Sequence, residues 1–215
     1  MRRGLSQNAL IPALALIAVL AADIPPARAG NYVLDRIHSD ATFKVRHLVA
    51  RFTGKFNDFN CSITGDPAKP ADSSVQFTIK TASIDTGQPI RDDHLRSADF
   101  FDVEKFPEIT FKSTSIKTSS RKNVYEVTGD LTMHGVTKRI TLPVEYLGTI
   151  KSPRGYDAAG LTLTATINRK DFGIVWNETL DGGGLVLGDE VEVTINLEMA
   201  KKAPAASEGT KEKTK

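Results

Sequence analysis

The sequence predicts an all-β fold of antiparallel strands that carries one short helix. Apolar and polar residues alternate with a period of two along most of the chain, and Gly-, Pro-, Asn- and Ser-rich turns separate the alternating runs. One stretch, residues 87–101, breaks the alternation. Strict alternation is typical of half-buried strands, and regularly spaced strands with such turns indicate a sandwich or a barrel.

The alternating runs predict the strands in chain order. Each run sets an apolar face against a face rich in Thr, Lys and Glu. The runs cover residues 31–35, 41–47, a Gly-interrupted segment at 52–63, and residues 74–80, 108–114, 124–135, 138–146, 160–169 and 190–199. Both a sandwich and a barrel fit this pattern, but pairing of the first run with the last would remove both sheet edges, as a barrel requires.

The two ends of the chain are expected to lie outside the folded domain. Residues 1–29 combine Arg2 and Arg3, an apolar run at 9–22 and an Ala-Arg-Ala site, which predicts a secretory signal peptide cleaved after Ala29. The apolar run is shorter than the roughly 20 residues of a membrane span, so no integral span is expected after cleavage. The Lys-, Ala- and Ser-rich residues 201–215 predict a disordered tail. Residues 30–200 then form one domain.

Charge and cysteine content narrow the class of function. The signal peptide and the tail are basic, which leaves residues 30–200 with a net charge of about −3 and gives no support to a nucleic-acid partner. Cys61 is the single cysteine, so an intrachain disulfide is excluded. It alternates with apolar neighbours, which predicts a buried and inert thiol. If it were exposed, it would offer a bridge to a second chain in a homodimer.

The segment from 87 to 101, GQPIRDDHLRSADFF, predicts the short helix. Pro89 suits the first turn of a helix, and the carboxylates of Asp92 and Asp93 suit the positive end of the helix dipole. Asp92 precedes Arg96 by four residues, the spacing of a surface ion pair. A structural helix over one end of a barrel accounts for each of these residues.

Two functional alternatives exist for the same segment. A general base built from His94 with Asp92 or Asp93 would make it catalytic, but adjacent helical residues diverge and no Gly-x-Ser-x-Gly motif occurs in the chain. The segment also fits the polar rim of a ligand mouth, where Arg91 or His94 would meet a head group. The four histidines show no spacing of two or four residues, so no metal site is expected.

Five stretches together resemble the YceI-like family of bacterial periplasmic proteins. They are DRIHSDATFKVRHL, RFTGKFNDFNCSI, SIDTGQPIRDDHLRSADFFDVEKFPEITFKS, VTGDLTMHGVTKRITLPV and NRKDFGIVWN with GDEVEVTINLE, and they extend from about Tyr32 to Met199. The resemblance implies an extended eight-stranded antiparallel lipocalin-like barrel around a hydrophobic tunnel. It also implies binding of long isoprenoid chains, including quinone-type and isoprenyl-phosphate lipids, with no enzymatic activity, no further cofactor and the HLRS helix near one end.

Alternation combined with this implied barrel predicts the residues that line the tunnel. Arg91 and His94 are the candidates for the head group, and Trp176, the single tryptophan, either packs at the barrel end or faces the ligand. The predicted lining is Phe43, Val45, Phe77, Ile79, Phe111, Val127, Leu131, Met133, Leu142, Val144, Leu163, Ile167, Trp176, Val193 and Ile195.

Three functions are compatible with the sequence. The first is a periplasmic protein that holds a long-chain isoprenoid or similar amphiphile for transport, storage or sequestration. The second is an enzyme that acts on a lipophilic substrate through the segment of Asp92 and His94. The third is a barrel whose interior is filled by its own side chains and which binds no lipid.

Overall fold

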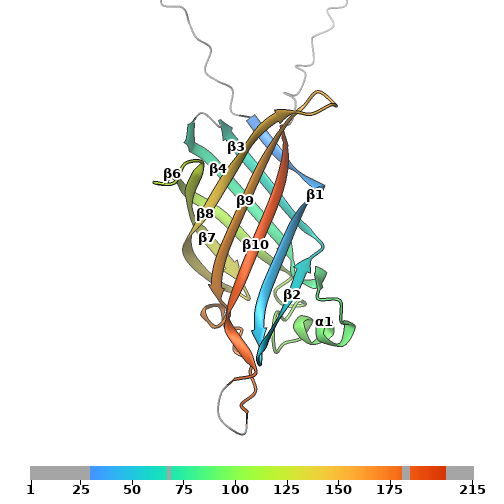
Figure 1. Ribbon diagram of the computed structural model, residues 1–215. Helices are drawn as coiled ribbons and strands as arrows, with labels where there is room; N and C mark the ends of the chain where they lie inside the picture. The colour runs from blue at the N-terminus through green and yellow to red at the C-terminus, as the bar shows by residue number, and fades with distance from the viewer. Residues whose placement is uncertain (1–29, 67–68, 181–184, 202–215) are drawn as a thin grey trace, which may run out of the picture.

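The computed structural model describes residues 30–66, 69–180 and 185–201, and these residues form ten strands, one α-helix and two short 3₁₀ helices (Figure 1). The strands are β1 (Gly30–His47), β2 (Ala50–Phe56), β3 (Phe59–Asp66), β4 (Lys69–Lys80), β5 (Ile84–Asp85), β6 (Glu108–Thr118), β7 (Val124–Met133), β8 (Val136–Lys151), β9 (Asp157–Asn168) and β10 (Leu187–Lys201). The helices are η1 (Thr81–Ser83), α1 (Pro89–Arg96) and η2 (Arg169–Phe172). The predicted signal peptide and most of the predicted tail lie outside the described residues. None of the helices within the described ranges has the length and apolar character needed to cross a membrane.

Eight of the strands close into a barrel. Neighbouring strands pair antiparallel in the order β1, β3, β4, β6, β7, β8, β9 and β10, and β10 pairs back with β1. Strand β2 is followed by β3 and pairs with residues 42–47 of β1. The two-residue strand β5 pairs with the end of β2, at Lys55 and Phe56. The closure confirms the predicted eight-stranded barrel, and the pairing of the first and last strands leaves β1 and β10 without a free edge along that seam.

The period of two decides which side chains face inward. On β4, Val75, Phe77 and Ile79 point to the interior, whereas Gln76 and Lys80 on the other face are exposed. Opposite charges and hydroxyls pair across strands on the outer face, as in the bidentate contact of Arg139 with Asp130. The apolar side chains therefore gather inside one closed sheet, and this interior is the core of the protein.

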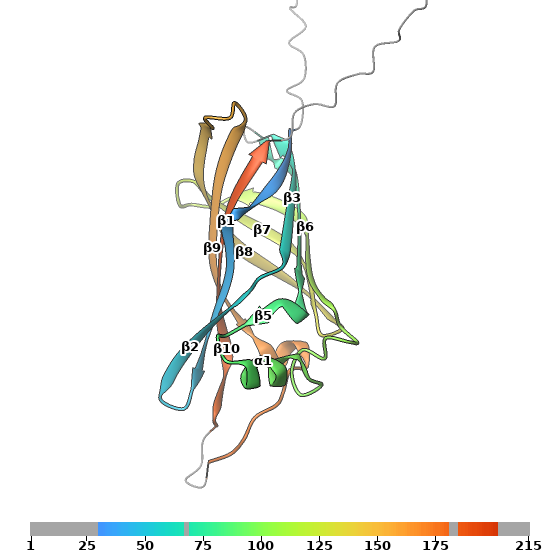
Figure 2. The same ribbon diagram turned by 90° about the vertical axis from the view of Figure 1, so that its right-hand side faces the viewer.

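Helix α1 lies across one end of the barrel (Figure 2). Pro89 occupies its first turn as predicted, and Leu95 turns its side chain into the core. The predicted surface pair of Asp92 with Arg96 is wrong. Asp92 is only 6% exposed, and its carboxylate accepts hydrogen bonds from the backbone N–H and the hydroxyl of Thr86, at 2.8 and 2.6 Å.

Arg96 pairs instead with Asp93, three residues before it, at 3.0 Å. Its guanidinium also donates to the carbonyl oxygens of Ala82 and Ile84, which follow β4. Helix α1 is therefore fixed to the barrel from both sides, by the buried carboxylate of Asp92 and by the guanidinium of Arg96. The sequence spacing identified the helix but not its partners, because the partners belong to another segment.

Replacing Asp92 with Ala should lower the free energy of unfolding by about 2–3 kcal/mol, because a buried N–H and a hydroxyl lose their charged acceptor. Asp93→Ala is the matched control: its pair with Arg96 is largely exposed, and its loss should cost less than about 1 kcal/mol. Chemical denaturation of both variants checks the difference. Equal costs would show that the contact between Asp92 and Thr86 does not fasten the helix.

Candidate ligand-binding cavity

A cavity of about 330 Å³ occupies the interior of the barrel. Its wall takes side chains from all eight barrel strands, from β2, and from the segment of α1, and nearly all of them are apolar. The volume lies at the lower end of the range found for sites that enclose small molecules, and such sites are mostly apolar with a few placed polar groups. The barrel is therefore not completely filled by its own side chains.

Fourteen of the fifteen predicted lining residues lie on the wall of this cavity. They are Phe43, Val45, Phe77, Ile79, Phe111, Val127, Leu131, Met133, Leu142, Val144, Leu163, Ile167, Val193 and Ile195. The structure places them around one interior, and their contact with a ligand stays a prediction.

Trp176 does not lie on the wall. Its ring packs against those of His94 and Phe100, at centroid distances of 5.0 and 5.1 Å, and of these three residues only Phe100 lies on the cavity wall. The structure therefore favours the packing alternative for Trp176 over contact with a ligand.

An aromatic cluster closes the cavity at the end covered by α1. Phe56 lies 5.7 Å from Phe43 and 5.8 Å from Phe101, ring centroid to ring centroid, and Phe52 meets Phe43 edge to face. Gly54 makes this cluster possible, because a Cβ at that position would lie 2.3 Å from the Phe43 ring. Sequence reasoning missed Phe52, Phe56 and Phe101 as wall residues. Their signal was present in the alternation of residues 52, 54 and 56, where a glycine interrupts the apolar face.

The two predicted head-group residues lie outside this aromatic cluster. Arg91 stacks its guanidinium over the Phe52 ring, 4.4 Å from the centroid, and donates to the hydroxyl and carbonyl oxygens of Thr86. His94 places its Nε2 3.0 Å from a carboxylate oxygen of Asp99. Neither side chain is on the cavity wall. Contact with a ligand would require the head group to emerge at the α1 end.

The catalytic alternative loses the dyad on which it depended. His94 pairs with Asp99, whereas Asp92 is buried and satisfied by Thr86, so these two side chains do not act together. The nearest hydroxyl along the chain, that of Ser97, donates to the backbone carbonyl of His94 and not to the ring. The segment holds the helix in place and presents no nucleophile activated by His94.

The opposite end of the cavity carries several hydroxyl groups. Ser73, Tyr125 and Tyr146 lie on the wall near the ends of β4, β7 and β8 that point away from α1. At this end the ladder between β4 and β6 stops at Gln76 and Lys112, and the Ser113 hydroxyl accepts one further bond from the Val75 N–H. The cavity thus reaches the place where β4 and β6 separate.

Cys61 also lies on the cavity wall. It is 1% exposed, and burial raises the pKa of its thiol to about 12. The prediction of a buried, unreactive thiol is confirmed, and a disulfide to a second chain through Cys61 would require the barrel to open.

Comparison with known proteins assigns the family. The model of the YceI-like domain matches residues 32–199. The chain belongs to the YceI-like family. A UPF0312 protein of Pseudomonas putida (strain GB-1) is 43% identical over 162 residues, which cover 72% of this chain and 84% of that relative.

Solved structures agree with the barrel. The crystal structure of BcnA from Burkholderia cenocepacia is 28% identical, with a TM-score of 0.68 and coverage of 77% of this chain and 98% of that one. A polyisoprenoid-binding domain from Saccharophagus degradans, at 19% identity and a TM-score of 0.59, covers 80% of this chain and 98% of its own, and shares the fold. The resemblance seen in the sequence motifs is thereby confirmed, as is the lipocalin-like barrel that it implied.

The stability that Cys61 contributes should decline at alkaline pH. Its folded-state pKa of about 12 lies above the ordinary value of 9.0, so the contribution is complete below pH 9 and is lost as the pH rises towards 12. The loss should approach about 1.4 kcal/mol per pH unit, because the unfolded thiol ionises while the buried one does not. The difference in unfolding free energy between wild type and Cys61→Ala, measured from pH 8 to 11, checks this. A difference that does not change with pH would contradict the burial of an un-ionised thiol.

Proposed function

We propose that the protein binds a long apolar lipid chain inside the barrel, most simply that of an isoprenoid, and shields it from water. The observation that carries the proposal is the apolar cavity along the barrel axis, walled by side chains from every barrel strand. Burial of apolar surface yields about 25 cal/mol per Å², so a chain that fills the cavity gains several kcal/mol without any directional contact. Quinone-type and isoprenyl-phosphate lipids both have such chains.

The ligand is carried or stored and not converted. Among the described residues, the cavity wall holds no pair of acidic and basic groups poised for proton transfer, and its buried charged residue, Arg169, is occupied. The guanidinium of Arg169 donates to the carbonyl oxygens of Gly188, Ile174 and Trp176 and pairs with Asp189. The predicted signal peptide supports a periplasmic location, where a lipid chain needs shelter to cross between membranes. The polyisoprenoid-binding domain that shares the fold supports the same ligand class.

The head group of the ligand is proposed to emerge at the hydroxyl-bearing end of the barrel. Ser73, Tyr125 and Tyr146 lie on the wall at that end, and the Tyr146 hydroxyl pairs with that of Thr149, whereas phenylalanine rings pack against one another at the α1 end. A head group that stays hydrated costs no burial of charge. Arg91 and His94 remain the rival site, at the other end of the cavity.

The first experiment is native mass spectrometry of the protein purified from its own periplasm, followed by extraction and identification of any bound lipid. One lipid with a long apolar chain per protein supports the proposal and identifies the ligand. A protein that arrives empty and does not take up an added isoprenol would instead support the barrel without a ligand.

A charge inside the barrel should abolish lipid uptake, because the carboxylate would be buried against the apolar chain. Phe77→Glu places it on the cavity wall, and Gln76→Glu, one residue away on the exposed face, is the matched control. Ala165→Phe fills part of the cavity without a charge and serves if Phe77→Glu does not fold. Both wall variants should weaken isoprenol binding at least about tenfold, and the control less than about twofold. Unchanged binding by folded wall variants would refute the cavity as the site.

Variants at the two ends should locate the head group. The double variant Tyr125→Phe with Tyr146→Phe should weaken binding of an isoprenyl phosphate more than that of the matching isoprenol, because hydroxyl bonds to the phosphate are lost, while the loss of the bond between Tyr146 and Thr149 affects both ligands alike. Arg91→Ala with His94→Ala should leave both affinities unchanged. The opposite pattern, measured by fluorescence competition, would place the head group beside α1.

A further inference from the structure

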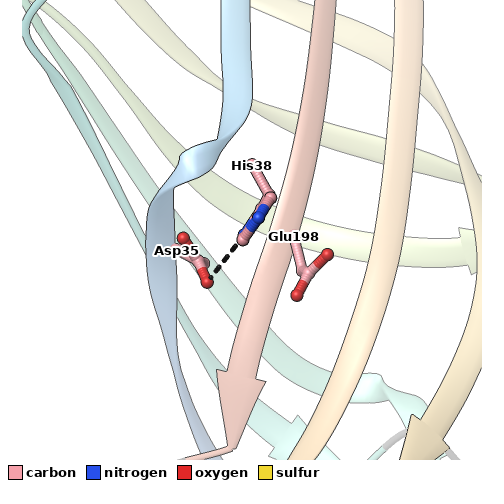
Figure 3. Close-up of side chains that lie close together, drawn as sticks. All are labelled: Asp35, His38 and Glu198. Carbon is pink, nitrogen blue, oxygen red and sulfur yellow. Dashed lines mark hydrogen bonds and ion pairs between the residues drawn. The ribbon is translucent and has the colours of Figure 1, made fainter. Parts of the chain in front are cut away.

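The outer face of the seam between β1 and β10 carries a cluster of side chains that the lipid cavity does not use. The register runs from Asp35 opposite Glu198 to Asp40 opposite Asn196, so residues 36–39 of β1 bulge out against a single residue of β10. His38 lies on this bulge. Figure 3 shows its ring and the carboxylates of Asp35 and Glu198 gathered beside the seam.

The bulge is held firmly enough to position these side chains. One oxygen of Asp35, Oδ1, accepts a bond from the Ile37 N–H at 3.0 Å, and the other, Oδ2, faces Nδ1 of His38. The Ser39 hydroxyl donates to the Asp35 carbonyl at 2.6 Å and accepts from the Glu198 N–H at 2.9 Å, which ties the bulge to β10. Bulges of this kind aim side chains away from the regular sheet.

The separations of the donor atoms suit a transition-metal ion. Nδ1 of His38 lies 3.2 Å from Oδ2 of Asp35, and one donor atom from each of the three residues lies within 4.8 Å of the others. Zinc binds nitrogen and oxygen at about 2.0–2.2 Å, so two donors on one tetrahedral ion lie about 3.4 Å apart. Asp35 and His38 already have that spacing, and a small rotation of the Glu198 side chain brings in the third donor.

The charge balance favours a cation. Two carboxylates stand beside one imidazole, and the neighbouring Arg36 is engaged by Asp58 and by the Asn57 carbonyl. Among the described residues, no side chain forms a hydrogen bond or an ion pair with the Glu198 carboxylate, although it is only partly exposed. The hydrogen bond between His38 and Asp35 explains why these two side chains lie together. It does not explain why the Glu198 carboxylate lies beside them.

We propose that Asp35, His38 and Glu198 bind one divalent transition-metal ion of the zinc class on the outside of the barrel. An imidazole donor favours Zn²⁺ over Ca²⁺ or Mg²⁺, which prefer oxygen alone. Three protein ligands leave at least one coordination position to water, so the site resembles an open zinc site more than a closed structural one. A bound ion would fasten the bulge of β1 to β10 across the seam that closes the barrel.

The sequence predicted no metal site, because the histidines have no metal-binding spacing. Glu198 follows Asp35 and His38 by about 160 residues, and the three side chains come together only because the first and last strands pair. Two of them are three residues apart on a bulge, which regular strand or helix periodicity does not describe.

The test uses tag-free protein that has been stripped with a chelator and titrated with Co²⁺, whose visible absorption reports its ligands, followed by competition with Zn²⁺. One equivalent should bind, and Glu198→Gln and His38→Ala should each weaken binding at least about tenfold. The matched controls are Glu190→Gln on the same strand and His47→Ala at the far end of β1, both exposed, and they should bind as wild type does.

Glu198→Gln is the decisive variant, because it removes a carboxylate that pairs with no other side chain of the described residues, and it should leave the metal-free barrel as stable as wild type. Zn²⁺ should raise the melting temperature of wild type but not of Glu198→Gln. Absence of stoichiometric Co²⁺ binding, or full binding by Glu198→Gln, would overturn the proposal. Lipid uptake is measured separately and does not depend on this site, which lies on the other face of the strands.

Discussion

The pairing of β1 with β10 is the constraint on which the rest of the structure depends. These strands come from opposite ends of the domain, and their ladder runs from Tyr32 with Lys201 to His47 with Leu187. Without it the sheet would expose two long edges and the apolar faces would have no closed interior. With this pairing, the inward-facing side chains of every barrel strand are shielded from water, and the cavity has a continuous wall.

The same seam presents different chemistry on its two faces. Leu34 and its partner Met199 point inward, and Met199 is fully buried on the cavity wall. The next pair, Asp35 with Glu198, points outward and offers the proposed metal ligands. Because successive residues of a strand point to opposite faces, the proposed lipid site and the proposed ion site use neighbouring residues of the same strands, and the carboxylates stay outside the barrel.

The two ends of the barrel are unequal, and this inequality gives the cavity a direction. At one end Asp92 holds α1 over a cluster of phenylalanine rings, and Arg169 satisfies the carbonyl groups of the adjoining loop. Burial lowers the pKa of the Arg169 guanidinium, yet its contacts with carbonyl oxygens and Asp189 favour the charged form. At the other end, Ser73, Tyr125 and Tyr146 lie on the wall. This difference underlies the proposal that the head group of a bound lipid emerges at the end opposite α1.

The sequence by itself determined most of the strands, the inward faces and the short helix, because these follow from the local period of the backbone. It did not show that the runs at 31–35 and 41–47 form one strand, β1, or that the run at 52–63 divides into β2 and β3. Phe77, Leu131 and Ile195 could be assigned to the interior without knowing their neighbours. Only the tertiary structure decided that Asp92 bonds to Thr86, that Trp176 packs against Phe100, and that His38 lies near Glu198. Those partners depend on the register between distant segments and on a bulge. A period of two fixes which face a side chain takes, but not what it meets there.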